Sequence, residues 1–277
     1  MPFCALDALR LHYILLKPQS AAVELSDPLS TPPRSPLKIV LLHGLFVGNL
    51  AAWYLSVGRE LSKKHEVLMY DLRGHGKSGR PAEGYDVKTQ VNDLRALLEG
   101  VGWSESALSI VGHSYGGVIG LEHALLYPQS VHSLALIDVP LASDDPEEPD
   151  AMSFASPEDL LNRLPLPLQE TLKGGGRRAR KRLESWFALS AQTTLLSDLQ
   201  STPPLIEERL QQIRCPTLAL YGTRSPCDAS ARRIKRAIPH AHLCWVEGAG
   251  HFLLNEAPRD VERALTHFFD DQLYDRA

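Results

Sequence analysis

The sequence is poor in the features that build disulfide, zinc or membrane-spanning structures. Only 4 of its 277 residues are cysteine, and none forms a C-x-x-C pair or has zinc-ligand spacing with histidine. Free thiols in a reducing compartment are the expectation. No apolar stretch approaches the length needed to cross a bilayer, and the start lacks the basic region and long apolar core of a secretory signal. We therefore expect a cytoplasmic protein, with an organellar matrix also open, and no stable membrane insertion.

The chain also lacks an excess of positive charge. Its net charge of -4 and pI near 6.3 argue against a nucleic-acid binder. With 44% hydrophobic and 22% charged residues, it can build a full buried core. One dense basic run, 177–182, is typical of the solvated face of a helix. Contact with an anionic substrate such as an acyl-coenzyme A, with an acidic membrane or with a partner stays open.

What the sequence has instead is an alternation of short apolar runs and helical patterns. Seven runs have the length and branching of buried strands, namely 9–16, 38–44, 65–74, 107–114, 133–140, 216–223 and 242–250. Helical spacing occurs at 89–102, 115–128 and 257–273. This alternation predicts an α/β fold with a mostly parallel sheet covered by helices on both faces. Residues 141–210 break the rhythm, and we interpret them as a helical cap insertion into a core formed by 1–140 and 211–277.

The stretch VGHSYGGVIG (111–120) carries a nucleophile motif. Gly112, Ser114 and Gly116 match G-x-S-x-G between a predicted strand and a predicted helix. In such an elbow the serine sits in a strained turn, and the glycines let neighbouring chain approach without a Cβ clash. The helix N-terminus directs its free N–H groups at charge that develops on a substrate. Ser114 is therefore the expected nucleophile.

A serine at its free pKa needs a base, and the expected chain order is Ser, acid, His. His251 fits this order, because it follows the last predicted strand and a small-residue loop and precedes the final helix. The expected oxyanion donors are the backbone N–H of Tyr115 and that of Leu45, which lies in the loop after LLHG. His43 is expected to hold this loop rather than act as a second base.

The segments LLHGLF, YDLRGHGKS, GHSYGG and GAGHFLLNEAP stand in the order of the α/β-hydrolase superfamily, which the chain resembles over about 38–140 and 211–272. The closest resemblance is to an esterase branch with an HGLF loop, which includes bacterial acyl-ester hydrolases and mitochondrial relatives. The resemblance implies an α/β-hydrolase fold with an eight-stranded, mostly parallel sheet. It also implies a Ser–acid–His triad and no cofactor.

The acid is the member of the triad that the sequence leaves open. Most proteins of the superfamily carry an aspartate where this chain has Ser225 in GTRSP. Asp228, three residues further on, is one candidate, although it is also suited to the start of a helix. Asp138, at the end of the strand after the elbow, is the other, and branches similar to this one take their acid from that position. We favour Asp138, because an acid that orients the histidine needs a rigid base.

Other residues are expected to surround the site. His43, Phe46 and Trp186 are predicted to border the substrate, with Trp186 lining an apolar acyl pocket or packing the insertion onto the sheet. The stretch DLRGHGKSGRP (71–81) is interpreted as a tight turn beside the site. Within that turn, Asp71 and Arg73 are expected to pair with each other.

These residues predict a serine hydrolase that cleaves small-molecule acyl esters or thioesters. Three alternatives stay open. The same scaffold could perform C–C hydrolysis, a lyase step or acyl cyclisation, because function depends on the pocket rather than on the fold. The chain could also be a non-catalytic ligand binder, or an interaction protein that uses its basic run.

Overall fold

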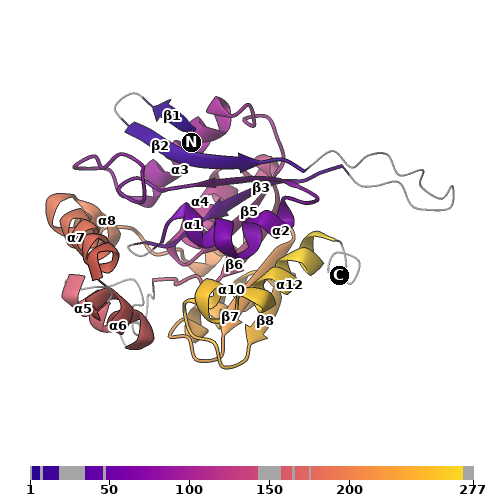
Figure 1. The fold of residues 1–277 in the computed structure, drawn as a ribbon. Coiled ribbons are helices and arrows are strands. Elements are labelled where there is room, and N and C mark those ends of the chain that lie inside the picture. Colours follow the sequence, from indigo (N-terminus) through magenta and orange to yellow (C-terminus); the bar gives the residue numbers. More distant parts are fainter. Residues whose placement is uncertain are drawn as a thin grey trace, which may run out of the picture.

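The structure is a computed structural model that describes residues 2–6, 9–18, 35–45, 48–142, 157–163, 166–174 and 176–270 (Figure 1). Eight strands form one sheet in the order β1-β2-β4-β3-β5-β6-β7-β8. Their bounds are β1 Phe3–Leu6, β2 Leu9–Leu16, β3 Lys38–Leu42, β4 Glu66–Tyr70, β5 Leu108–His113, β6 Val131–Ile137, β7 Thr217–Gly222 and β8 His242–Val246.

The sheet is mostly parallel, as the sequence predicted. β3 to β8 run parallel to one another, and the antiparallel pairings are those of β2 with β1 and with β4. All seven predicted strands are present with bounds shifted by a few residues, so the predicted α/β architecture with a mostly parallel eight-stranded sheet is confirmed. The eighth strand is β1, a four-residue edge strand that is too short to show an apolar pattern.

Helices cover both faces of the sheet (Figure 1). Their bounds are α1 Leu50–Trp53, α2 Arg59–Leu61, α3 Val87–Gly100, α4 Tyr115–Leu126, α5 Pro157–Arg163, α6 Leu166–Gly174, α7 Gly176–Gln192, α8 Leu195–Gln200, α9 Glu207–Leu210, α10 Asp228–Ala237, α11 Leu253–Glu256 and α12 Pro258–Phe269. A π-helical turn at Tyr54–Gly58 joins α1 to α2, and a 3₁₀ turn at Pro128–Ser130 follows α4. The helices at α3, α4 and α12 match predicted segments, whereas no pattern predicted the helical segment 50–61.

Alternate residues of the central strands build two hydrophobic cores. Ile39 and Leu41 of β3 pack with α1, α11 and α12 on one face, and Val40 and Leu42 pack with α3, α4 and α10 on the other. This period of two is the geometry of a pleated strand buried on both faces. Because β5, β6 and β7 are neighbouring parallel strands, their carboxyl ends lie side by side at one edge of the sheet.

Helices α5 to α8 form a separate group beside the layered core (Figure 1). The side chain of Ser185 in α7 accepts a hydrogen bond from Arg80 (2.6 Å), and Asp198 in α8 accepts one from the backbone N–H of Tyr85 (2.7 Å). The basic run 177–182 lies within α7. The role of 141–210 as a cap stays a prediction, and part of it (143–156) lies outside the described residues. None of the helices described is both long and apolar enough to span a membrane.

Candidate active site

The predicted elbow is present between β5 and α4. Ser114 has φ 54° and ψ -127°, a strained backbone conformation that few residues with a side chain adopt. A Cβ on Gly112 would lie 2.4 Å from the Gly116 carbonyl oxygen, and one on Gly116 would lie 2.3 Å from the Leu42 carbonyl oxygen. Both contacts are with backbone, so neither position tolerates a side chain without moving the turn.

Ser114, His251 and Asp138 form a continuous hydrogen-bonded chain. Ser114 Oγ lies 3.0 Å from His251 Nε2, and His251 Nδ1 lies 2.8 Å from Asp138 Oδ1. An ionised carboxylate can only accept, so Nδ1 carries the proton of the neutral ring and Nε2 keeps its lone pair for the serine hydroxyl. This is the tautomer that lets a histidine take a proton from serine.

Asp138 is held rigidly where β6 ends. It is completely buried, and its φ of 48° makes it, with Ser114, one of the two non-glycine residues of the described chain with positive φ. Its Oδ2 accepts a hydrogen bond from the backbone N–H of Gly222 (3.0 Å), and its Oδ1 accepts one from the hydroxyl of Ser225. Ser225, which stands where most of the superfamily has its aspartate, thus supports a carboxylate supplied by the neighbouring strand.

The other candidate acid lies on the surface. Asp228 is the first residue of α10, and its side chain is 54% exposed and paired with Arg232 at 3.4 Å. Within the part of the chain that the structure describes, no hydrogen bond or ion pair joins it to His251. Of the two carboxylates that the sequence left open, the geometry brings only Asp138 to His251.

Two residues that sequence reasoning did not single out hold the His251 loop. His113, directly before the nucleophile, donates from Nε2 to the His251 carbonyl oxygen at 2.9 Å. The Glu256 carboxylate accepts from the backbone N–H of Gly250 (2.8 Å) and of Phe252 (3.2 Å), on either side of His251. Burial, together with the neighbouring His251 ring, lowers the pKa of His113 to about 4, so this ring is neutral at pH 7. Its place inside the G-x-S-x-G motif was the available sequence signal.

The loop after β3 approaches the elbow closely. A Cβ on Gly44 would lie 3.0 Å from Ser114 Cβ, which brings the predicted oxyanion donor Leu45 next to the nucleophile. Tyr115 opens α4, where backbone N–H groups lack partners within the helix. His43 is 1% exposed, donates from Nδ1 to the Gly44 carbonyl oxygen (2.7 Å) and accepts at Nε2 from the backbone N–H of Leu72 (3.0 Å). Both ring nitrogens are therefore engaged with backbone, and His43 holds the loop without a free nitrogen for substrate.

Two other residues, Phe46 and Trp186, were predicted to border the substrate. Phe46 lies outside the described residues. Trp186 is a buried residue of α7 whose ring stacks on that of Phe187 at 6.1 Å, so its contact with substrate stays a prediction.

The expected pairing of Asp71 with Arg73 is wrong, although the Asp71 carboxylate does accept a hydrogen bond within the 71–81 turn, from the backbone N–H of Lys77 (2.9 Å). The Asp71 carboxylate bonds His12 Nδ1 (2.7 Å) and the backbone N–H of Leu50 (2.9 Å). Arg73 instead bonds Asp93 of α3 through two nitrogens at 2.6 and 2.7 Å. β2, α1 and α3 bring these partners from distant parts of the sequence to the turn.

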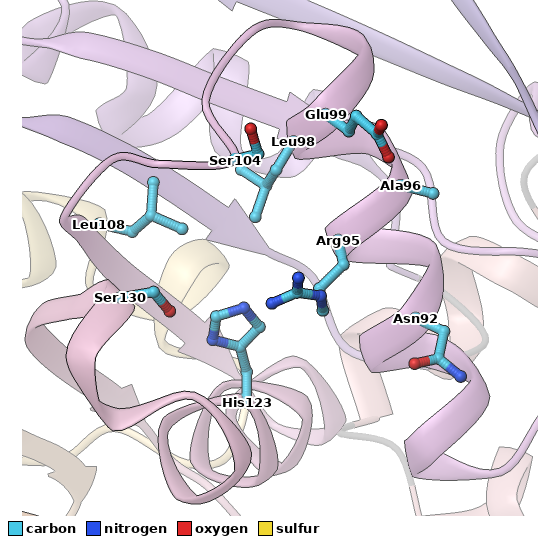
Figure 2. Close-up of a pocket in the computed structure, with 9 residues that line it drawn as sticks. All are labelled: Asn92, Arg95, Ala96, Leu98, Glu99, Ser104, Leu108, His123 and Ser130. Carbon is cyan, nitrogen blue, oxygen red and sulfur yellow. The ribbon is translucent and has the colours of Figure 1, made fainter.

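Two cavities among the described residues lie apart from the Ser114, His251 and Asp138 side chains. One of about 270 Å³ lies between α3, α4 and the start of β5, and it contains Arg95 and His123 (Figure 2). Burial and then the Arg95 charge lower the pKa of His123 to about 4. The other, about 460 Å³, runs from Tyr115 along α4 to the segment 199–205. Neither is lined by a side chain of the Ser114, His251 and Asp138 chain, so both lie outside the hydrogen-bonded site.

Comparison with known proteins shows the family to which the chain belongs. Residues 39–264 match the model of the Alpha/beta hydrolase family, and the chain belongs to this family. Polyketide synthase ThaQ from Burkholderia thailandensis is 28% identical over 253 residues, which are 85% of this chain but only 12% of ThaQ. AB hydrolase superfamily protein YisY from Bacillus subtilis is 26% identical over 83% of this chain and 90% of its own length. The crystal structure of a membrane phospholipase A superposes with a TM-score of 0.74 at 25% identity, over 97% of this chain and 85% of that one.

Proposed function

We propose that this protein is a serine hydrolase of carboxylic ester or thioester bonds, with Ser114, His251 and Asp138 as its catalytic triad. The observation that carries the proposal is the chain of two hydrogen bonds, 3.0 Å from Ser114 Oγ to His251 Nε2 and 2.8 Å from His251 Nδ1 to Asp138 Oδ1. Membership of the Alpha/beta hydrolase family supports a hydrolase, and the similarity to a protein named a phospholipase A supports an acyl ester as substrate.

Each residue has a defined role in the proposed reaction. Ser114 Oγ attacks the acyl carbonyl carbon while its proton passes to His251 Nε2, and Asp138 stabilises the imidazolium that forms. The backbone N–H groups of Leu45 and Tyr115 bind the oxyanion, and losing one such donor costs about 100-fold or more in rate. His251 then protonates the leaving alcohol or thiol. Water, activated by the same histidine, releases the acyl group and restores Ser114.

A fluorophosphonate probe, which reacts covalently with an activated serine, tests this proposal directly. The wild-type chain is expected to label at Ser114, and Ser114→Ala is expected to lose labelling and to lower kcat by at least about 10⁴-fold. Ser104→Ala, which removes an exposed hydroxyl, is the matched control and should label normally. A folded Ser114→Ala variant that still turns over would refute the assignment, and a wild-type chain that never labels would favour a ligand binder.

The substrate class is tested with a panel of nitrophenyl esters of increasing acyl length together with acyl-coenzyme A thioesters. Turnover of esters or thioesters that is lost in Ser114→Ala supports the proposal. Probe labelling without turnover of any panel member would instead favour C–C hydrolysis, a lyase step or acyl cyclisation on the same scaffold.

A further inference from the structure

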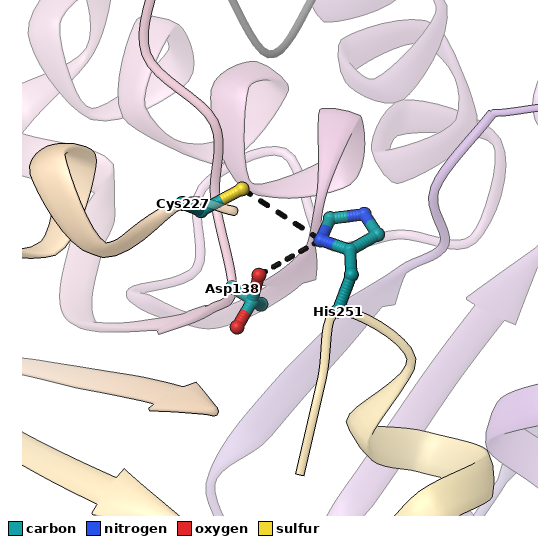
Figure 3. A group of neighbouring side chains, drawn as sticks. All are labelled: Asp138, Cys227 and His251. Carbon is teal, nitrogen blue, oxygen red and sulfur yellow. Dashed lines mark hydrogen bonds and ion pairs between the residues drawn. The ribbon is translucent and has the colours of Figure 1, made fainter. Parts of the chain in front are cut away.

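A third side chain faces the ring nitrogen that joins His251 to Asp138. Cys227 Sγ lies 3.8 Å from His251 Nδ1, and in Figure 3 the dashed lines from the thiol and from the Asp138 carboxylate converge on this nitrogen. Cys227 is 2% exposed and sits immediately before α10, where its backbone N–H donates to Ser225 Oγ at 3.0 Å. The proposed acyl transfer does not use this sulfur.

The three side chains have the composition and spacing of a metal site. One ligand atom from each of Asp138, Cys227 and His251 lies within 4.8 Å of the other two. A zinc ion bonds histidine nitrogen and carboxylate oxygen at about 2.0 Å and cysteine sulfur at about 2.3 Å. Nδ1 lies 2.8 Å from the Asp138 oxygen and 3.8 Å from the Cys227 sulfur. An ion at those bond lengths would have a nitrogen–metal–oxygen angle of about 90° and a nitrogen–metal–sulfur angle of about 125°. These angles suit a distorted tetrahedron whose fourth ligand is water.

From this geometry we infer that Cys227, His251 and Asp138 form an inhibitory binding site for a thiophilic divalent cation of the zinc class. The regulatory part of this inference rests on the proposed function, whereas the metal site itself does not. The ion is no part of the proposed catalysis. It occupies the place of the Nδ1 proton, between the two groups that the triad must keep in hydrogen-bond contact.

Binding of the ion moves two protons. The ion bonds Nδ1, and the proton that Nδ1 carried is transferred to Nε2, so the imidazole stays neutral as the other tautomer. Cys227 Sγ–H loses one proton to solvent and binds as thiolate, because the thiolate is the ligand form. With a proton on Nε2, His251 cannot accept one from Ser114, and acyl transfer stops.

The ligand set also predicts selectivity among cations. Sulfur and imidazole ligands suit zinc and softer ions, whereas Mg²⁺ and Ca²⁺ prefer all-oxygen shells. A cation can reach the site past His251, because the side chain of His251 is 21% exposed whereas that of Asp138 is fully buried. Zn²⁺ should therefore bind and inhibit at concentrations where Mg²⁺ has no effect.

Binding is measured on the full chain by calorimetric titration with Zn²⁺ and by the thiolate-to-metal absorption of added Co²⁺. We expect one site per chain, a thiolate absorption band, and at least a 10-fold weaker affinity in Cys227→Ser, because even groups that only support metal ligands are worth 10- to 100-fold. Cys244→Ser, which changes a partly exposed cysteine of β8, is the matched control and should bind as wild type. Ser114→Ala should also bind normally, because Ser114 is not a ligand.

Activity is the second readout. Zn²⁺ should inhibit wild type and Cys244→Ser reversibly, with recovery on adding EDTA, and it should inhibit Cys227→Ser at least 10-fold less strongly. Equal zinc affinity in wild type and Cys227→Ser, or wild type without thiolate–cobalt absorption, overturns the metal site. If wild type binds zinc through Cys227 but cleaves no ester, the proposed function fails while the metal site stands. The cobalt band needs no variant, so misfolding of Cys227→Ser would not leave the site untested.

Discussion

Replacing Asp138 with asparagine tests how the buried carboxylate controls His251. Asp138 Oδ2 accepts a hydrogen bond from the backbone N–H of Gly222. An asparagine must therefore place its carbonyl oxygen there, because its NH₂ group would face the Gly222 N–H donor to donor. Its NH₂ group then faces His251 Nδ1 and donates to it, which moves the ring proton to Nε2. A histidine in that tautomer cannot take the Ser114 proton. We therefore expect Asp138→Asn to lower kcat by about 10⁴-fold, equivalent to about 5 kcal/mol in the activation free energy.

The assay is kcat on a nitrophenyl ester together with the rate of fluorophosphonate labelling, measured on protein whose folding is checked by thermal denaturation. Asp228→Asn is the matched control, because its carboxylate is 54% exposed and pairs with Arg232 on the surface. Its kcat should stay within about twofold of wild type, since exposed ion pairs contribute little. If Asp228→Asn collapses while Asp138→Asn retains most of its activity, the reasoning about the buried carboxylate is refuted.

Three further predictions concern the elbow, a buried ion pair and acid stability. Gly116→Ala should abolish fluorophosphonate labelling or lower the Tm, because its Cβ would lie 2.3 Å from a backbone oxygen; normal labelling at unchanged Tm contradicts this. Asp93→Leu should lower the free energy of unfolding in urea by about 3–5 kcal/mol, because it leaves the buried Arg73 charge unpaired, and adding Arg73→Met should recover much of the loss. Burial lowers the folded-state pKa values of His75 and His113 to about 3 and about 4, below the unfolded value near 6.5. The stability from these two neutral rings is fully present well above pH 6.5, and the free energy of unfolding should fall by about 2 kcal/mol per pH unit between pH 6 and 4; a free energy of unfolding in urea that stays constant over that range would contradict this prediction.

The order of strands and helices could be predicted from the sequence because it depends on local patterns of residues. Buried parallel strands are short, apolar and β-branched, and the runs at 38–44, 107–114 and 216–223 meet that description. β1 and the helical segment 50–61 escaped prediction for the opposite reason. The first is four residues long, and the second is divided into two short α-helices by a π-helical turn, so neither offers a window with a clear period.

The site likewise contains residues that the sequence predicts and contacts that only the fold creates. The residues around Ser114 and the loop that carries His251 are recognisable because a tight turn restricts residue types locally. The pairing of Arg73 with Asp93 and the contact of Cys227 with His251 have no local signature. Each joins residues about 20 or more positions apart, and each depends on which helix packs against which strand end.

By itself the sequence determined the α/β layering, the elbow around Ser114 and the presence of a histidine in the last loop, because strand length, glycine spacing and helix period are properties of neighbouring residues. Only the tertiary structure decided which aspartate reaches His251. The two residues are 113 positions apart, and they meet because β6 lies between β5 and β7 in the sheet. That order places Asp138, at the end of β6, next to His251. Asp228, at the start of α10, points to solvent instead.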